Sequence, residues 1–264
     1  MDGLWLAALS GLIGGGTLLV GAAVAWFVDI PQRVVAGIMA VGAGVLISTL
    51  AFELVEEAAA DGGLIPTTVG FLGGAILYIV ADQLVSRPKK KAVVVADVDT
   101  ADGDGGASIV VRRAGAVGAA SGAGLVIAIG ALIDGIPESL VMGLSVLQGG
   151  ISIPIVAAIA ISNFPEGLGS TAALKRGGST GRFVALLWSG IALVTVAAAM
   201  LGFAAFQSAP ANLIALITTI AAGGLLAMVC NTMIPEAFDE QHALTGLWAT
   251  IGFLGAFLLH ELAG

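Results

Sequence analysis

The chain has 264 residues, of which 58% are hydrophobic and only 11% are charged, and its mean hydropathy is +1.05. Because a soluble domain carries about 25% charged residues, this composition excludes an ordinary soluble protein and indicates an integral membrane protein in a lipid bilayer. The formal net charge is −8, and we expect no nucleic-acid partner. The alternation typical of β-strands is absent, so we predict an all-α fold rather than a β-barrel.

Eight apolar segments follow one another along the chain, each of a length that can cross a hydrocarbon core of about 30 Å. The first has no basic flank before its apolar run, so we interpret it as a retained helix rather than a signal peptide. We predict a single transmembrane domain over residues 1–264 with eight spans. They are residues 4–27, 34–56, 64–86, 115–147, 152–174, 182–206, 211–234 and 243–262.

The ten Lys and Arg residues all lie in the connections that follow the first, third and fifth segments, or at their edges. Basic residues stay on the cytoplasmic side, so both termini are predicted to lie outside, in a prokaryotic cell (inner) membrane. The connection 87–114 combines basic residues, aspartates and glycines, and we predict a flexible cytoplasmic loop there. The basic residues are Arg33, Arg87, Lys89, Lys90, Lys91, Arg112, Arg113, Lys175, Arg176 and Arg182.

The two ends of the chain contain similar short patterns. Residues 70–74 read Gly-Phe-Leu-Gly-Gly, and residues 252–256 read Gly-Phe-Leu-Gly-Ala. The pair Glu-Ala follows a glycine-rich apolar run both at 57–58 and at 236–237. The sixth helix comes five positions after the first in the order of spans, so the two cross the membrane in opposite directions. Helices 1–3 and 6–8 would therefore form an inverted repeat in a 3+2+3 arrangement. Inverted repeats of this kind are typical of secondary transporters, whose sites lie near the membrane midplane.

The middle of the chain carries one short pattern twice. Residues 134–138 read Asp-Gly-Ile-Pro-Glu, and residues 162–166 read Ser-Asn-Phe-Pro-Glu. In each copy a polar residue precedes a glutamate by four positions, so both side chains lie on one face of a helix. The proline before each glutamate removes a backbone donor and frees a carbonyl group one turn earlier.

Ionisable side chains inside a span cost about 2.5–3.5 kcal/mol each and usually face a partner or a water-filled cavity. If the fourth and fifth helices pack with their motifs together, three carboxylates converge, and they repel one another unless a cation or a proton lies among them. Oxygen ligands without cysteine or histidine suit Mg²⁺, Mn²⁺ or Fe²⁺ at least as well as Zn²⁺. The predicted metal ligands are Asp134, Glu138, Ser162, Asn163 and Glu166.

Two other interpretations use the same residues. The prolines could simply kink two helices while the glutamates bond to nearby backbone, or the carboxylates could form a proton relay. The recurrence of the motif at matching depth favours a function over simple kinks, because carboxylates inside a membrane are rare and are usually functional.

Further acidic residues lie near the ends of two other predicted helices. Glu53, Glu56 and Glu57 end the second helix on its outer side and are candidates for an entrance that gathers cations. Residues at the inner end of the seventh helix are candidates for an exit, and a solvated helix end is the alternative at both places. The exit candidates are Glu236, Asp239, Glu240 and His242. His260, near the outer end of the last helix, is interpreted as an interfacial residue.

The paired motifs resemble those of the ZIP family of divalent metal transporters. Residues 163–167, Asn-Phe-Pro-Glu-Gly, are the closest match to the family pattern His-Asn-x-Pro-Glu-Gly. The resemblance covers nearly the whole chain, including the expected 3+2+3 arrangement and the long loop between the third and fourth helices. It implies that Glu138 and Glu166 are the bridging carboxylates of a transport site, and that the protein is a homodimer.

The sequence departs from that family pattern at several ligand positions. Asp134 and Ser162 stand where the family usually has histidine, and Gly135 stands where it has asparagine. Leu193 replaces a glutamate of the sixth helix. The resemblance, read with these departures, implies one oxygen-only site rather than a typical two-metal zinc site.

We therefore predict a transporter, not an enzyme, that moves a divalent cation such as Zn²⁺, Mn²⁺, Fe²⁺ or Cd²⁺ towards the cytoplasm without an enzyme cofactor. Because both family histidines are missing, a ZIP-like protein with a non-metal substrate is an alternative. A metal sensor that does not transport, and an intramembrane hydrolase that uses acidic residues, are the other two. Matched Pro-Glu motifs favour transport over hydrolysis.

Overall fold

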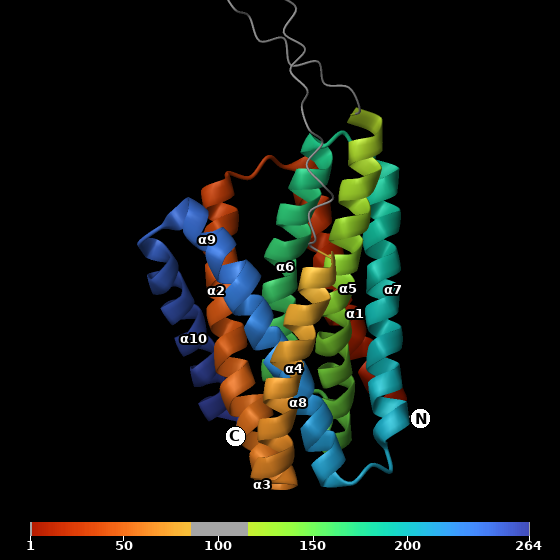
Figure 1. Ribbon diagram of the computed structural model, residues 1–264, viewed down its shortest axis with the longest axis vertical. Coiled ribbons are helices and arrows are strands. Elements are labelled where there is room, and N and C mark those ends of the chain that lie inside the picture. The colour runs from red at the N-terminus through yellow and green to blue at the C-terminus, as the bar shows by residue number, and fades with distance from the viewer. Residues whose placement is uncertain (1, 86–115, 264) are drawn as a thin grey trace, which may run out of the picture.

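The computed structural model describes residues 2–85 and 116–263, and all regular secondary structure in these ranges is helical. Eight helices in these ranges are long and apolar enough to cross a membrane, as predicted (Figure 1). In chain order they are α1 (Asp2–Phe27); α2 (Gln32–Thr49) with the π-helical segment η1 (Leu50–Glu56) and α3 (Glu57–Gly62); α4 (Leu64–Val85); α5 (Ala116–Gln148); α6 (Ile153–Arg176); α7 (Gly181–Phe206); α8 (Ala211–Met228) with the π-helical segment η2 (Val229–Met233) and α9 (Ile234–Gln241); and α10 (Leu244–Ala263).

Two spans continue beyond their predicted ends. The second runs to Gly62 rather than to residue 56, and the seventh runs to Gln241 rather than to residue 234. Glutamate and alanine are good helix formers, so the acidic residues at these places do not end the helix. The second span ends where Gly63 adopts a left-handed conformation with φ of 92°, which glycine adopts without strain.

The predicted loop 87–114, with six of the ten basic residues, lies outside the described residues.

The helices run alternately in opposite directions, and both chain termini lie at the same end of the bundle (Figure 1). We call this end the terminal end. At the opposite end Lys175 Nζ lies 3.0 Å from both the Trp26 carbonyl oxygen and Asp29 Oδ1, which connects the end of α6 to the end of α1. We call this second end the basic end. It carries Arg33, Lys175, Arg176 and Arg182.

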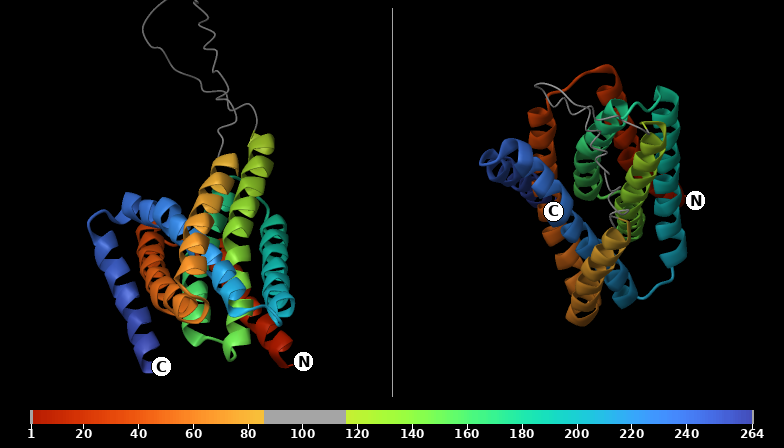
Figure 2. Two further views of the ribbon diagram at one scale, coloured as in Figure 1. Left: turned by 60° about the horizontal axis from the view of Figure 1, so that its bottom comes forward. Right: turned by 45° about the horizontal axis from the view of Figure 1, so that its top comes forward.

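The helices form two four-helix units. In unit A, α1 packs against α6 and α7, and α5 packs against α7. In unit B, α2 packs against α10 and α4 packs against α8; Figure 2 shows α10 at the edge of the molecule. Glycines bring the backbones of unit B together, since a methyl group on Gly44 would overlap the Ala249 carbonyl and one on Gly74 would overlap the Ile220 carbonyl.

The two units meet mainly where α2 packs on α6 and where α5 packs on α8. The largest cluster of buried apolar side chains lies along this boundary and draws residues from both units, for example Leu46 and Leu225 from unit B and Val141 and Ile159 from unit A. The boundary also contains a cavity with several polar side chains in its wall.

Candidate functional site

A cavity of about 360 Å³ lies between the two units. Its wall follows α4, α5, α6 and the seventh span from the middle of the bundle towards the basic end, for example from Glu138 to Ile127 on α5 and from Ser162 to Ser170 on α6. Four of the five predicted metal ligands line it. They are Asp134, Glu138, Ser162 and Glu166.

The repeated motifs place these four side chains as their spacing predicts. α5 is a continuous helix through Pro137, and α6 is continuous through Pro165, so the polar residue and the glutamate of each motif lie one turn apart on one face. A proline has no N–H to donate, so the carbonyl of Ile133, four residues before Pro137, loses its partner in the helix. The motifs therefore bring side-chain and backbone oxygens to the same depth.

Glu138 is the most deeply buried of the cavity acids, with only 2% of its surface exposed. Its carboxylate interacts with the amide of Asn163, which is equally buried. Among the described residues, Oε2 of Glu138 and Oδ1 of Asn163 have no hydrogen-bond partner. A buried acceptor without a partner reduces the stability of the fold by about 1–3 kcal/mol, and by more when it is charged. These two oxygens can therefore accept a hydrogen bond from a bound donor or bind a cation.

Asn163 and Ser162 are held by neighbouring backbone. Nδ2 of Asn163 donates to the carbonyl of Gly14 on α1 at 3.1 Å, and Ser162 Oγ donates to the Ile159 carbonyl at 2.9 Å. Because the serine hydroxyl is the donor in this hydrogen bond, its oxygen can still accept one, and Ser162 lines the cavity. Asn163 lies beside Glu138 rather than in the cavity wall itself.

The cavity has more polar wall residues than the sequence predicted. Asp82 and Glu236 add two carboxylates, and the hydroxyl groups of Tyr78 and Thr232 lie 3.3 Å apart across the wall. The wall residues of the described chain include five carboxylates and no lysine or arginine. Tyr78 and Thr232 carried no signal in the sequence, because neither is charged and neither belongs to a repeated motif.

The carboxylates share a cavity but do not form a closed cluster. Within residues 2–85 and 116–263, no three Asp, Glu, His or Cys side chains lie close enough together to hold one metal ion. A cation in the cavity would therefore be bound by one or two carboxylates with serine, amide or water oxygens. The predicted five-residue ligand set remains a prediction.

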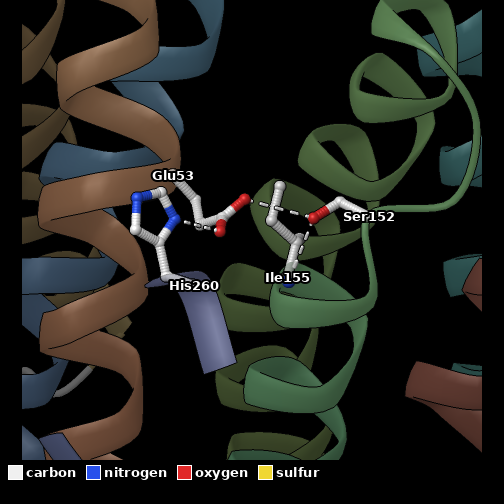
Figure 3. Close-up of polar contacts among 4 residues, drawn as sticks. All are labelled: Glu53, Ser152, Ile155 and His260. Atoms are coloured by element: carbon white, nitrogen blue, oxygen red, sulfur yellow. Dashed lines mark hydrogen bonds and ion pairs between the residues drawn. The ribbon is translucent and has the colours of Figure 1, made fainter. Parts of the chain in front are cut away.

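At the terminal end, the predicted entrance residues separate into two environments. Glu53 and Glu57 line a second cavity of about 90 Å³ together with Asp61, whereas Glu56 is not part of its wall. Glu53 is buried, and the other two glutamates are exposed. Glu53 is 8% exposed, and its carboxylate lies between His260 of α10 and Ser152 at the start of α6 (Figure 3). The interpretation of His260 as an interfacial residue did not anticipate this contact.

The predicted exit residues also differ from one another. All three carboxylates of α9 are exposed, but only Glu236 lines the large cavity, whereas Asp239 and Glu240 are not part of its wall. His242 ends α9 with a positive φ of 49°, and its Nδ1 lies 3.0 Å from the Phe238 carbonyl oxygen. Only Glu236 of this described group therefore contacts the cavity.

The chain was also compared with known proteins. It matches no protein-family model, and no curated protein matches it. The resemblance to the ZIP family therefore continues to depend on the two Pro-Glu motifs, and a functional conclusion has to be drawn from the site itself.

Proposed function

We propose that the protein is a membrane transporter that moves a divalent metal cation through the cavity between its two units. The observation that carries this proposal is the composition of the cavity wall, where Asp134, Glu138 and Glu166 face one space in the middle of apolar helices. Carboxylates in such surroundings are costly unless a cation offsets their charge.

The cation would be bound by oxygen. One or two of the three carboxylates Asp134, Glu138 and Glu166 would hold it at a time, and Ser162 or water would supply the remaining oxygens. The unpaired Oε2 of Glu138 and Oδ1 of Asn163 are acceptors that a cation or its water shell can satisfy. An oxygen-only set suits Mn²⁺, Fe²⁺ or Mg²⁺ at least as well as Zn²⁺ or Cd²⁺.

The proposed inverted repeat draws support from two features. The π-helical segments η1 and η2 begin at Leu50 and Val229, 179 positions apart, which is also the separation of Glu57 and Glu236 in the repeated Glu-Ala pairs. The packing of α2 on α10 corresponds to that of α8 on α4 when helices 1–3 are exchanged with helices 6–8. Such a repeat is typical of transporters that alternate between two opposite openings.

The cavity extends from the middle of the bundle towards the basic end and not towards the terminal end. Between it and the small cavity lies a layer of buried apolar side chains, and on α5 the two cavities are separated by the ten positions from Glu138 to Gln148, or about 15 Å. We propose that a relative movement of units A and B closes one opening and opens the other. The layer includes Leu46, Leu50, Val141, Ile155, Ile159 and Leu225.

We further propose that the basic end faces the cytoplasm, because basic residues are retained on that side of a membrane. The terminal end would then face outside, with Glu53 and Glu57 at the entrance and Glu236 near the exit. Transport towards the cytoplasm would carry a cation from the small cavity, through the apolar layer, to the large one.

Uptake into vesicles tests the proposal. Purified protein is reconstituted into liposomes, and the accumulation of Mn²⁺, Fe²⁺, Zn²⁺ and Cd²⁺ is compared with that in protein-free liposomes. We expect uptake of at least one of these ions, and loss of that uptake in Glu138→Gln and Glu166→Gln. Glu240→Gln, which changes an exposed carboxylate of α9, is the matched control and should transport normally.

The other outcomes separate the alternatives. Binding of a metal without accumulation would indicate a sensor, and the absence of both would favour a non-metal substrate. Uptake that is unchanged in Glu138→Gln and Glu166→Gln would contradict the proposed route through the cavity.

A further inference from the structure

The Glu53 carboxylate at the terminal end connects three helices. Its Oε1 lies 2.7 Å from Nδ1 of His260 on α10, and its Oε2 lies 3.3 Å from the hydroxyl oxygen of Ser152, which precedes α6 (Figure 3). Because an ionised carboxylate can only accept hydrogen bonds, the histidine N–H and the serine O–H are the donors. Both oxygens of the carboxylate are therefore occupied.

Ser152 has a second role that fixes its hydroxyl group. Its Oγ accepts a hydrogen bond from the backbone N–H of Ile155 at 3.3 Å and so caps the N-terminus of α6. The oxygen of the Ser152 hydroxyl group accepts the hydrogen bond from the backbone, so the hydrogen of the same hydroxyl group can be donated to Glu53. The partial positive charge at the start of α6 also favours a carboxylate at this position.

Glu53, His260 and Ser152 are divided between the two units. Glu53 and His260 lie in unit B, whereas Ser152 lies in unit A. The hydrogen bond from Ser152 to Glu53 therefore crosses the boundary between the units at the end that the large cavity does not reach. His260 keeps the carboxylate in place from the unit B side, where its ring also stacks on Phe52 with centroids 5.8 Å apart.

The backbone that carries Glu53 is unusual. Glu53 lies in the π-helical segment η1, and single π turns inside α-helices are rare and occur frequently at functional sites. The other π-helical segment, η2, supplies Thr232 and Met233 to the wall of the large cavity. Each π-helical segment thus contributes side chains to the cavity at one end of the bundle.

From these contacts we infer that Glu53 and Ser152 form a latch that holds units A and B together at the terminal end, with His260 as its support. Separation of Ser152 from Glu53 is then a required step before the small cavity can widen and the apolar layer can open. A cation that arrives at Glu53 competes with the serine for the carboxylate oxygen, so its arrival favours release. This inference rests on the proposed alternating access.

Substitutions of Ser152 test the latch without removal of the helix cap. Ser152→Asp keeps a good capping residue but replaces the donor by an anion that repels Glu53, whereas Ser152→Asn keeps both the cap and a donor. Glu56→Gln removes an exposed charge from the same π-helical segment and is the matched control. His260→Gln removes the support and should have a smaller effect than Ser152→Asp.

The readout is the accessibility of single cysteines in nanodiscs, in a background in which the lone Cys230 is replaced by serine. Thr218→Cys reports on the small cavity and Ser170→Cys on the large one, because each residue lines that cavity. Labelling rates with a charged maleimide are measured without added metal, so the assay does not depend on transport.

We expect Ser152→Asp to increase the labelling rate at position 218 about tenfold and to decrease it at position 170, since a hydrogen bond to a charged group stabilises one state by at least that factor. Ser152→Asn and Glu56→Gln should label like the unsubstituted protein. The latch is refuted if Ser152→Asp labels no faster at position 218, or if Glu56→Gln accelerates labelling equally.

The two proposals fail in different ways. If the labelling rates respond as expected but the liposomes accumulate none of the four metals, metal transport is wrong and the latch is retained. If the liposomes accumulate metal but the labelling rates do not respond to Ser152→Asp, the latch alone is wrong.

Discussion

Replacement of Glu138 by glutamine is the most informative single change in the cavity. The side chain is only 2% exposed, and its Oε2 has no partner among the described residues. A buried unpaired acceptor costs about 1–3 kcal/mol, and more when it carries a charge. Glu138→Gln removes the charge with almost no change of shape. We therefore expect it to stabilise the metal-free protein.

The size of the effect can be measured as a shift in melting temperature. For a chain of this size about 1 kcal/mol corresponds to a shift of about 2–4 °C, so removal of a penalty of about 1–3 kcal/mol should raise the melting temperature of the metal-free variant by about 2–12 °C. A metal at 100 times its dissociation constant stabilises the unsubstituted protein by about 2.7 kcal/mol, and this increment should be absent in the variant.

The assay is a thermal-shift titration of detergent-solubilised protein with Mn²⁺ and Zn²⁺, before and after chelation, with Glu240→Gln as the exposed control. The reasoning is refuted if Glu138→Gln melts at a lower temperature without metal and keeps the full increment with metal. In that case Glu138 would be a structural residue.

Three other contacts can be tested by substitution. Gly74→Ala should destabilise the protein by about 1–3 kcal/mol, because its methyl group would overlap a carbonyl of α8, whereas Gly73→Ala, which meets open space, should fold normally; yields and melting temperatures compare the two. Trp188→Phe removes a buried 2.8 Å hydrogen bond to a threonine of α6 and should cost about 1–3 kcal/mol in a denaturation experiment. Asn163→Asp places a second anion beside Glu138, so we expect a lower melting temperature without metal and a larger recovery when a divalent cation is added. A recovery no larger than in the unsubstituted protein would contradict this.

The spans and the motif face could be predicted from the sequence because both depend on local periodicity. Asp134 and Glu138 are four positions apart, and so are Ser162 and Glu166, so each pair lies on one helix face however the helices pack. Whether the two faces meet in one cavity depends on how α5 and α6 pack. From the sequence we could predict only that the carboxylates converge if these helices pack with their motifs together.

Contacts between distant segments could not be predicted. His260 and Glu53 are 207 positions apart, and no pattern in the chain connects them. The predicted ends of the second and seventh spans are also wrong, because the glutamates at these positions favour helix and the helices continue past them. The π-helical segments have no sequence signature that separates them from ordinary helix, so the environment of Glu53 was visible only in the structure.

The two π-helical segments change how positions along their spans relate to one another. One extra residue in a helical turn rotates everything beyond it by about 100° relative to a regular α-helix. Positions before Leu50 and after Glu56 therefore follow two different helical wheels, and cross-linking pairs must be counted separately on each side. Deletion of one residue within η1 would restore a single wheel and turn Glu57 and Asp61 away from the small cavity that they now line.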